Sequence, residues 1–514
     1  MFAPSLANMN PLWLLIELFS ILCFLILYYR HLQSKKTSHF VPIKWPVMGV
    51  LPGLAANIHH FHDWVTALLA GAGYTFRVNG LPGQRYFATC DPANVRHIFT
   101  SNFANYPKGH EFVEIFDDFL GGGLFNADGE SWRRQRVKAQ MLMTAPRFRA
   151  FTASCSRDKA EKSLLPFLAL AADEGRPCDL QDVFLRLSFD LTCTLIFGID
   201  PACLQVTGLP PEVPFLRAAD VALETIFLRH IIPMACWKLM RRLNVGPERK
   251  MAAARRTIDS FVAEMITRRR VDKVNEGADL LSSFICHDDN TSDDDRRSTD
   301  ESIRDTTVNL LFAGRDGPGT GLSWFFYLVS KNPRVEQKLL GELSTVVVSS
   351  RSRDSSMVTF QASELNKLVY LHAALCESLR LYPPVPFEHK VAAAADELPS
   401  GKKLKAGDKV LFFNYSMGRM KGVWGKDCME FRPERWITEE GKLRHEPSYK
   451  FFSFNTGPRT CLGKELAFVQ MKTVAAAVLW NFDVQVVPGH VVEPKLSLIL
   501  HMKDGLLVRV HRRA

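Results

Sequence analysis

The sequence predicts a mainly α-helical protein with a minor β part, built as a single large domain behind an N-terminal membrane anchor. Three observations lead to this fold class. The chain opens on an apolar run, helical periodicity dominates 131–270, and further apolar helix patterns follow at 305–331 and 465–480. Alternating strand patterns are short and lie only at 74–89 and after Pro383. No internal repeat divides the chain.

The first element is an apolar segment from Leu12 to Tyr29, interrupted only by Glu17 and Ser20. As a helix it would span about 27 Å at roughly 1.5 Å per residue, enough to cross or nearly cross a bilayer. Basic residues follow at 30–36 and none precedes the segment, so the positive-inside rule places the remainder in the cytosol. A cleaved signal peptide would carry its charge before the apolar run. We therefore expect a single-pass transmembrane anchor at 1–29, in the endoplasmic reticulum membrane.

A basic and proline-rich stretch at 30–53 follows the anchor. The prolines and glycines that interrupt it are Pro42, Pro46, Gly49, Pro52 and Gly53. They predict a stiff, non-helical hinge between the membrane and the globular part. Two hydrophilic stretches, at 287–301 and 349–357, are typical of surface loops and neither has the composition of a linker. The sequence therefore predicts one large domain at 54–514.

The amino-acid composition narrows the kinds of binding partner and of cellular compartment that we expect for this protein. Lys and Arg number 64 against 54 Asp and Glu, a formal charge of +10 that suits an anionic membrane face or an acidic protein partner. No basic tail or Lys/Arg-rich run with interleaved aromatics is present, so we expect no nucleic-acid partner. The 11 cysteines are odd in number and lack C-x-x-C spacing, which favours a reducing compartment over a secreted disulfide scaffold.

The strongest chemical signal is the stretch from Phe454 to Gly463, which reads F-N-T-G-P-R-T-C-L-G and directly precedes the helix pattern at 465–480. A thiolate bound to haem iron needs hydrogen-bond donors and positive potential, and amides at a helix N-terminus supply both to Cys461. Arg459 can pair with the haem propionates, Phe454 can shield the sulfur, and Gly463 lets the backbone approach the porphyrin. A buried structural cysteine is the alternative, but four spaced matches in about ten residues make it improbable.

This stretch resembles the haem-binding loop of the cytochrome P450 superfamily, F-x-x-G-x-R-x-C-x-G, without a departure. The resemblance runs from about Trp45 to the end of the chain. It implies the cytochrome P450 fold, a catalytic domain at 54–514, haem b bound axially through the Cys461 thiolate, and electrons from NADPH through a reductase. Thiolate ligation favours O–O cleavage on the iron.

The segment at 365–381 resembles the superfamily's E-x-x-R helix through Glu377 and Arg380. At i, i+3 they share a helix face, although such a pair on a surface helix would be worth little. Arg435 resembles the loop arginine that completes a three-residue ion network. The resemblance makes these residues structural supports beneath the haem.

Trp132 and Arg136 resemble the helix positions that hydrogen-bond a haem propionate. They stand at i, i+4, and an indole N–H and a guanidinium both donate to a carboxylate. A basic surface helix with one buried tryptophan explains the same residues equally well. His389, with Lys390, is a weaker candidate for a second propionate contact.

The helix at 305–331 resembles the helix that crosses the haem face, with a small-residue kink where dioxygen binds. The superfamily pattern places an acid and then an alcohol there to relay protons. Asp316 matches the acid, whereas Gly317 stands where the alcohol should be. Pro318 removes the backbone bond to the Gly314 carbonyl, which could then hold a proton-donating water, and Thr320 is a poorer substitute. A purely structural kink with impaired activity is the alternative.

Several stretches, including 101–109, Phe125–Asp128 and 455–470, resemble the plant branch that oxidises fatty acids and alkanes. That resemblance implies insertion of one atom of dioxygen into a C–H bond of a long-chain aliphatic lipid. Apolar residues that fall in segments lining such sites are Phe112, Phe116, Phe119, Phe125, Phe312 and Leu498 to Leu500, although they are equally readable as core. Two alternatives remain, a haem-dependent hydroperoxide rearrangement enzyme and a non-enzymatic membrane haem protein. Both rest on the missing alcohol at position 317.

Overall fold

The computed structural model describes residues 50–79, 85–209, 212–271, 279–285, 293–348 and 357–513. The anchor expected at 1–29 and the hinge up to residue 49 lie outside this part of the chain. Within it, no helix is long and apolar enough to cross a membrane. The non-helical hinge is wrong at its end, because α2 (Leu51–Ala56) begins there with Pro52 in its first turn. Proline is tolerated at that position because its missing N–H has no partner to lose.

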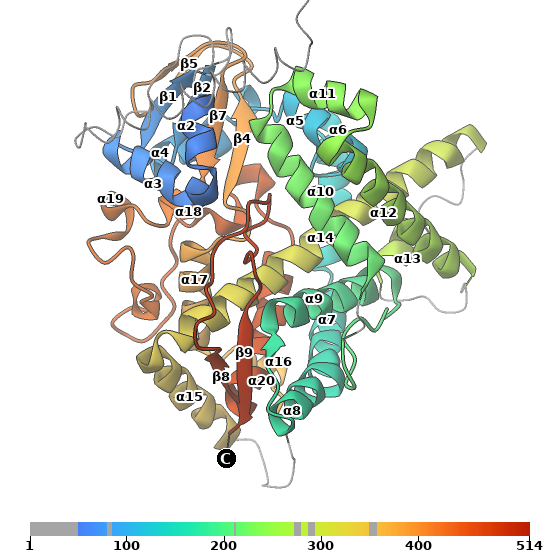
Figure 1. Cartoon of the computed structure of the whole chain (residues 1–514), viewed down its shortest axis with the longest axis vertical. Helices are drawn as coiled ribbons and strands as arrows, with labels where there is room; N and C mark the ends of the chain where they lie inside the picture. Colours follow the sequence, from blue (N-terminus) through green and yellow to red (C-terminus); the bar gives the residue numbers. More distant parts are fainter. Residues whose placement is uncertain are drawn as a thin grey trace, which may run out of the picture.

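Helices make up most of the protein, and α14 (Asp293–Ser330) runs through its middle (Figure 1). The helices before it are α3 (Phe61–Gly71), α4 (Pro92–Arg96), α5 (His110–Leu120), α6 (Gly129–Thr144), α7 (Pro146–Lys159), α8 (Leu165–Asp173), α9 (Leu180–Phe197), α10 (Pro214–Ile231), α11 (Met234–Leu243), α12 (Gly246–Val271) and α13 (Leu280–Ile285). Those after it are α15 (Pro333–Val348), α16 (Ala362–Leu365), α17 (Val369–Leu381), α18 (Asn414–Met417), α19 (Lys421–Trp424) and α20 (Lys464–Asn481). The predicted mainly helical class is confirmed.

The β part consists of three small sheets. One has the strand order β1-β2-β7-β4, from β1 (Thr75–Asn79), β2 (Arg85–Thr89), β7 (Lys409–Phe413) and β4 (Phe387–Val391). Only the β2–β7 pair in it is parallel. The second joins β3 (Cys178–Asp179), β9 (Leu507–Arg512) and β8 (Phe482–Val486), and the third pairs β5 (Asp396–Glu397) with β6 (Lys403–Leu404). The strands of the first sheet lie where alternation predicted them, at 74–89 and after Pro383.

The core is organised around α14. Its C-terminal half packs with α17 and α20 in one apolar cluster, and its middle packs with α5, α10 and α12 in another. Helix α9 lies along α14 and contributes to both clusters. The ends of α9 follow from its sequence. The Asp179 carboxylate accepts a 2.9 Å bond from the Gln181 amide, and Gly198 ends the helix with φ of 69°.

Two predicted boundaries change, and a third prediction falls almost wholly outside the described residues. The loop expected at 287–301 is helical from Asp293, because α14 begins 12 residues before the predicted start at Asp305. The loop expected at 349–357 lies almost wholly outside the described residues. The helix expected at 365–381 is divided into α16 and α17. A capping box between Gln361 and Glu364 begins the short first helix, which ends at Leu365, and the chain turns before Val369.

Candidate active site

A cavity of about 500 Å³ lies beside the middle of α14. Its walls come from α5, α6, α9, α14, β4, the start of α20 and the chain near Leu498. Most of the lining side chains are aliphatic or aromatic. Phe112, Phe116, Phe119, Phe125, Phe312, Leu498 and Ile499 all face it, as the sequence suggested. Leu500 does not line the cavity, and is fully buried instead.

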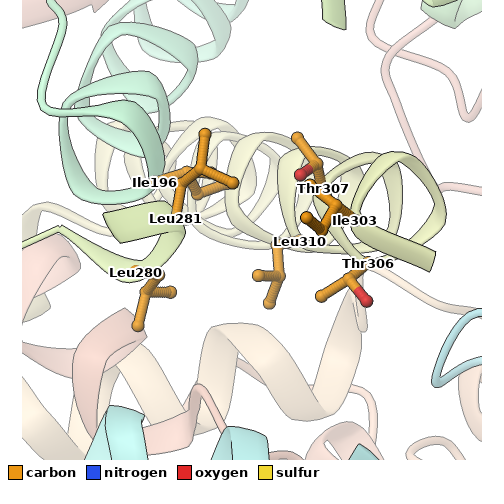
Figure 2. Close-up of a pocket in the computed structure, with 7 residues that line it drawn as sticks. All are labelled: Ile196, Leu280, Leu281, Ile303, Thr306, Thr307 and Leu310. Atoms are coloured by element: carbon orange, nitrogen blue, oxygen red, sulfur yellow. The ribbon is translucent and has the colours of Figure 1, made fainter. Parts of the chain in front are cut away.

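One end of the cavity is closed where α9, α13 and α14 meet. Figure 2 shows the side chains there, which surround a further void of about 10 Å³: Ile196, Leu280, Leu281, Ile303, Thr306, Thr307 and Leu310. Five of these seven residues also line the main cavity. Apolar surface therefore continues from the cavity into the space between the three helices.

The loop before α20 brings Cys461 to the cavity. The Cys461 amide donates a 2.8 Å bond to the Phe454 carbonyl, which closes the loop on itself. Gly457 has φ of 65°, and a Cβ there would overlap the Phe99 carbonyl. Only glycine suits that turn, because of both its backbone angle and its close contact.

Cys461 is exposed to the cavity, although it lies deep inside the protein. Burial raises the pKa of its thiol, whereas the Gly463 and Lys464 amides and the Arg136 guanidinium lower it. The protein therefore supplies part of the stabilisation that a thiolate needs. A bound metal cation would supply the remainder, because coordination deprotonates a thiol outright.

Cationic and donor groups surround the cavity on the α6 side. Arg459 donates 2.6 Å and 2.8 Å bonds to the Asp128 carboxylate and the Ala127 carbonyl, and its guanidinium lies 4.5 Å from the Trp132 ring centroid. Its Nε is buried without a hydrogen-bond partner. Arg136 donates a 2.6 Å bond to the Thr460 carbonyl. Trp132, Arg136 and Arg459 thus meet at one rim of the cavity.

A second group of basic residues lies close to them, since the Asp128 carboxylate that binds Arg459 also accepts a 2.9 Å bond from the Lys108 amide. Within the described part of the chain, both ring nitrogens of His389 and the Lys390 ammonium are buried without a hydrogen-bond partner. Burial lowers the pKa of Lys390 to about 8, and burial together with Lys390 holds the pKa of Lys108 well below its usual value. Glu388 is the nearest carboxylate, 3.6 Å from Lys390.

These two groups fit haem. Cations outnumber carboxylates around this end of the cavity, and several buried donors have no acceptor. The two propionates of haem are acceptors that suit such donors, and the Cys461 sulfur is a ligand that suits its iron. The sequence patterns missed Lys108, although the stretch at 101–109 stood out as family-like. Lys108 comes close to Lys390 of β4 only in the folded chain, where these two distant segments meet.

A buried ion network supports this floor of the site. Arg380 donates two 2.7 Å bonds to the Glu377 carboxylate, which also accepts a 3.2 Å bond from Arg435. The Trp436 indole adds a 2.8 Å bond. Glu377 is fully buried. The predicted three-residue network is confirmed, and Trp436 is a fourth member that the motif did not name.

The predicted catalytic positions lie on the stretch of α14 that borders the cavity. Asp316 and Gly317 line it, whereas Thr320 is fully buried and does not. The Thr320 hydroxyl therefore does not line the cavity in this structure, and its use as a substitute alcohol stays a prediction. Helix α14 continues through Pro318 without interruption. Gly317 lacks a positive φ, and a Cβ there would meet nothing within 4 Å.

Of the remaining predicted residues, Cys461, Arg459, Trp132, Arg136, Phe454, Gly463 and His389 all line the same cavity. They come from three separate parts of the chain, so the structure brings together what the motifs placed apart. Asp316 has two charged neighbours that the motifs did not single out. Arg315 Nη1 lies 3.1 Å and His501 Nε2 lies 3.3 Å from Asp316 Oδ1.

Comparison with known proteins agrees with this geometry. The family model described as Cytochrome P450 matches residues 41–509. Noroxomaritidine synthase of Narcissus aff. pseudonarcissus MK-2014 is 43% identical over 99% of this chain and 100% of its own length. Alkane hydroxylase MAH1 of Arabidopsis thaliana is 42% identical over 94% of this chain and 96% of its own. Cytochrome P450 86B1 of the same plant is 40% identical, with 94% and 88% covered.

Proposed function

The chain belongs to the cytochrome P450 family and is therefore a haem-thiolate monooxygenase supplied with electrons by a reductase, and we propose that it hydroxylates a long-chain aliphatic lipid. The observation that carries the substrate proposal is the apolar, phenylalanine-rich cavity beside α14. Such a lining desolvates alkyl chains and offers them few polar contacts. Fatty acids and alkanes are the substrates of this kind, and the name of one relative, alkane hydroxylase, agrees with them.

Within this proposal, each group of residues that lines the cavity has its own role. Bound haem would supply the oxidising chemistry, and the Cys461 sulfur would hold its iron. Arg136, Arg459 and Trp132 would hold haem carboxylates at one rim of the cavity, and His389 would add a further contact. The phenylalanine wall excludes water and holds the alkyl chain. Asp316 places a carboxyl group at the cavity surface, and Gly317 offers no hydroxyl beside it.

A second candidate comes from the noroxomaritidine synthases, whose identity of 43–44% spans nearly the whole chain. Their name assigns them a product other than a hydroxylated alkane. The polar groups that line the cavity, Asp316 and His230 among them, favour this candidate over a purely hydrocarbon substrate. The family match and the name of the hydroxylase relative favour oxygen incorporation over the rearrangement enzyme and the non-enzymatic haem protein.

We further propose the membrane arrangement that the sequence indicates. Residues 1–29 anchor the protein in the endoplasmic reticulum membrane, 30–53 connect the anchor, and 54–514 form the catalytic domain in the cytosol. The partner is an NADPH-cytochrome reductase. Helix α6 exposes Arg133 and Arg134 while Trp132 and Arg136 of the same helix line the cavity, and a basic face of this kind attracts an acidic partner.

One experiment tests the substrate proposal. Microsomes that contain the protein and a reductase are incubated with NADPH and a panel of fatty acids and alkanes, and products are identified by mass. We expect a gain of one oxygen atom on at least one aliphatic chain. Turnover of no aliphatic compound, by a protein whose reduced carbon monoxide spectrum is that of a thiolate haem, would favour the second candidate.

A further inference from the structure

His501 stands against the catalytic stretch of α14, although it lies on the chain between β8 and β9. Its side chain is buried, with 3% of the residue exposed. The backbone that carries it is fixed, because Trp324 of α14 donates a 2.7 Å bond to the Leu500 carbonyl. The Lys495 amide donates another 2.7 Å bond to the carbonyl of His501 itself. The position of the imidazole is therefore set largely by α14.

The imidazole is in direct contact with the acid of the cavity. His501 Nε2 lies 3.3 Å from Asp316 Oδ1, and both side chains are almost completely buried. In the described part of the chain, neither Asp316 oxygen nor this ring nitrogen has a well-directed hydrogen bond. Buried polar atoms in this condition are uncommon outside functional sites.

Arg315 is the other cation beside Asp316, but it cannot pass on a proton. Burial would lower the pKa of its guanidinium, yet Asp316 and Asp220 hold that pKa above its ordinary value. Its Nη2 is already committed to a 2.7 Å bond to Asp220 of α10. Arginine stays charged under all ordinary conditions. The imidazole is thus the contact of Asp316 that can pass on a proton, because its ring nitrogens can both donate and accept one.

The relay position next to Asp316 has no hydroxyl. Gly317 has no side chain, and the Thr320 hydroxyl does not reach the cavity. A proton that leaves Asp316 toward the cavity must therefore be replaced from the other side of the carboxylate. His501 occupies that side.

We propose that His501 is a positioning residue that holds Asp316 and returns its proton, in place of the missing alcohol. The proton moves from His501 Nε2 to Asp316 Oδ1, which leaves a neutral imidazole and a carboxylic acid. Asp316 then donates a proton to water in the cavity, and the imidazole regains one from solvent. No electrons are transferred in these steps. The inference rests on the monooxygenase function and on Asp316 as its cavity acid.

The charged groups around the His501 imidazole affect how the proposed proton transfer depends on pH. Helix α14 contributes Asp316 and Arg315, and α10 contributes Asp220. Asp182 of α9 acts electrostatically on Arg315. On the same loop, Lys495 acts on Asp220 and pairs with Glu224 at 2.6 Å. The nearest groups are therefore a carboxylate and a guanidinium that neutralise each other.

The test uses the full-length haem-loaded protein, reduced and bound to carbon monoxide. The infrared C–O stretch responds to proton donors at the cavity face of the haem, and requires neither substrate nor reductase. We expect the position of the band to depend on pH, because the proposed relay passes a proton between His501 and Asp316. His501→Gln and Asp316→Asn should each abolish that shift. His511→Gln, at an exposed position of β9, is the matched control and should retain it.

A second measurement follows turnover. His501→Gln should lower product formed per NADPH by on the order of 10²-fold, the lower end for a positioned proton donor, with peroxide rising in its place. A pH-independent band in the unmodified protein, or an unchanged shift in His501→Gln, would overturn the proposal. If no aliphatic lipid is oxidised but the band behaves as expected, the substrate proposal fails and this one stands. Should His501→Gln lack the thiolate-type spectrum, Asp316→Asn takes its place, and a shift retained in that variant would equally overturn the proposal.

Discussion

The guanidinium of Arg459 lies 4.5 Å from the centroid of the Trp132 ring, so that the loop carrying Cys461 and helix α6 meet face to face at the cavity rim. Each of these residues also belongs to a sequence motif of its own. The contact holds the cysteine loop independently of any bond from the sulfur.

Replacement of Cys461 by alanine should therefore remove the haem ligand without unfolding the loop. The unmodified protein, when reduced and treated with carbon monoxide, should show the strongly red-shifted Soret band of a thiolate haem, and Cys461→Ala should lose it. Circular dichroism should show the same helix content in both. Exposed Cys236→Ala is the control and should keep the band. A histidine-type spectrum in the unmodified protein would contradict the assignment.

Loss of the Glu377 carboxylate should be strongly destabilising. Glu377→Gln leaves Arg380 buried with an uncompensated charge, and such changes cost about 3–5 kcal/mol of unfolding free energy. A large fall in Tm should be measured by thermal unfolding. Arg432→Ala, whose side chain is 53% exposed, should change stability by no more than about 1 kcal/mol. Equal effects of the two substitutions would show that the network does not support the core.

Gly317→Thr should fold normally, because the position lacks a positive φ and has open space around it. If proton supply limits coupling, the added hydroxyl should raise product formed per NADPH and lower peroxide. Flat or reduced coupling, with haem spectrum and stability unchanged, would mean that the existing groups already perform the relay. Gly314→Ala is the steric contrast, since its Cβ would come within 2.5 Å of the Thr192 hydroxyl, and it should destabilise the protein.

Acid stability should depend on Asp396. Burial would raise the pKa of this carboxyl, but hydrogen bonds from Tyr106 and His97 outweigh burial and hold the pKa at about 2. Because the folded pKa lies below the ordinary value near 4, the stabilisation is complete above that pH and is lost as pH falls toward 2. Asp396→Asn should flatten this part of the stability–pH curve. Exposed Asp504→Asn should leave the curve unchanged.

Removal of residues 1–29 should weaken membrane attachment and leave a folded haem domain. After an alkaline wash of microsomes, the full chain should remain in the pellet and the shortened chain should move to the supernatant. Both should retain the thiolate-type spectrum. Protection of the catalytic domain from protease inside sealed microsomes would contradict the cytosolic orientation.

The motifs predicted most of the site because each of them is local. Cys461, Arg459, Trp132 and His389 could be found in short stretches of sequence, and the fold then brings them to one cavity. The contact between His501 and Asp316 could not be found in this way. It joins α14 to a loop almost 200 residues later, and no periodicity records such a contact.

Element boundaries were predictable only where apolar residues marked them. The helix at 465–480 matches α20 within one residue at each end. The first 12 residues of α14 were missed because their sequence, Asp293 to Arg304, is almost entirely polar and carries no apolar stripe. Helix α2 was missed because Pro52 indicated a hinge, although proline also suits a first helical turn.

The positions along the chain of the hydrogen-bond donors to Glu377 set the order in which this region assembles. Arg380 is three residues away and can reach the carboxylate as soon as α17 forms, whereas Trp436 is 59 residues further along. Between them the chain must complete β4 to β7 and return before the buried carboxylate gains its remaining donors. Closing that long loop costs conformational entropy, and the stabilising hydrogen bonds to Glu377 form only once the loop has closed. The segment from α17 to Trp436 should therefore form as one cooperative unit, and a single proteolytic cut within it should unfold the whole unit.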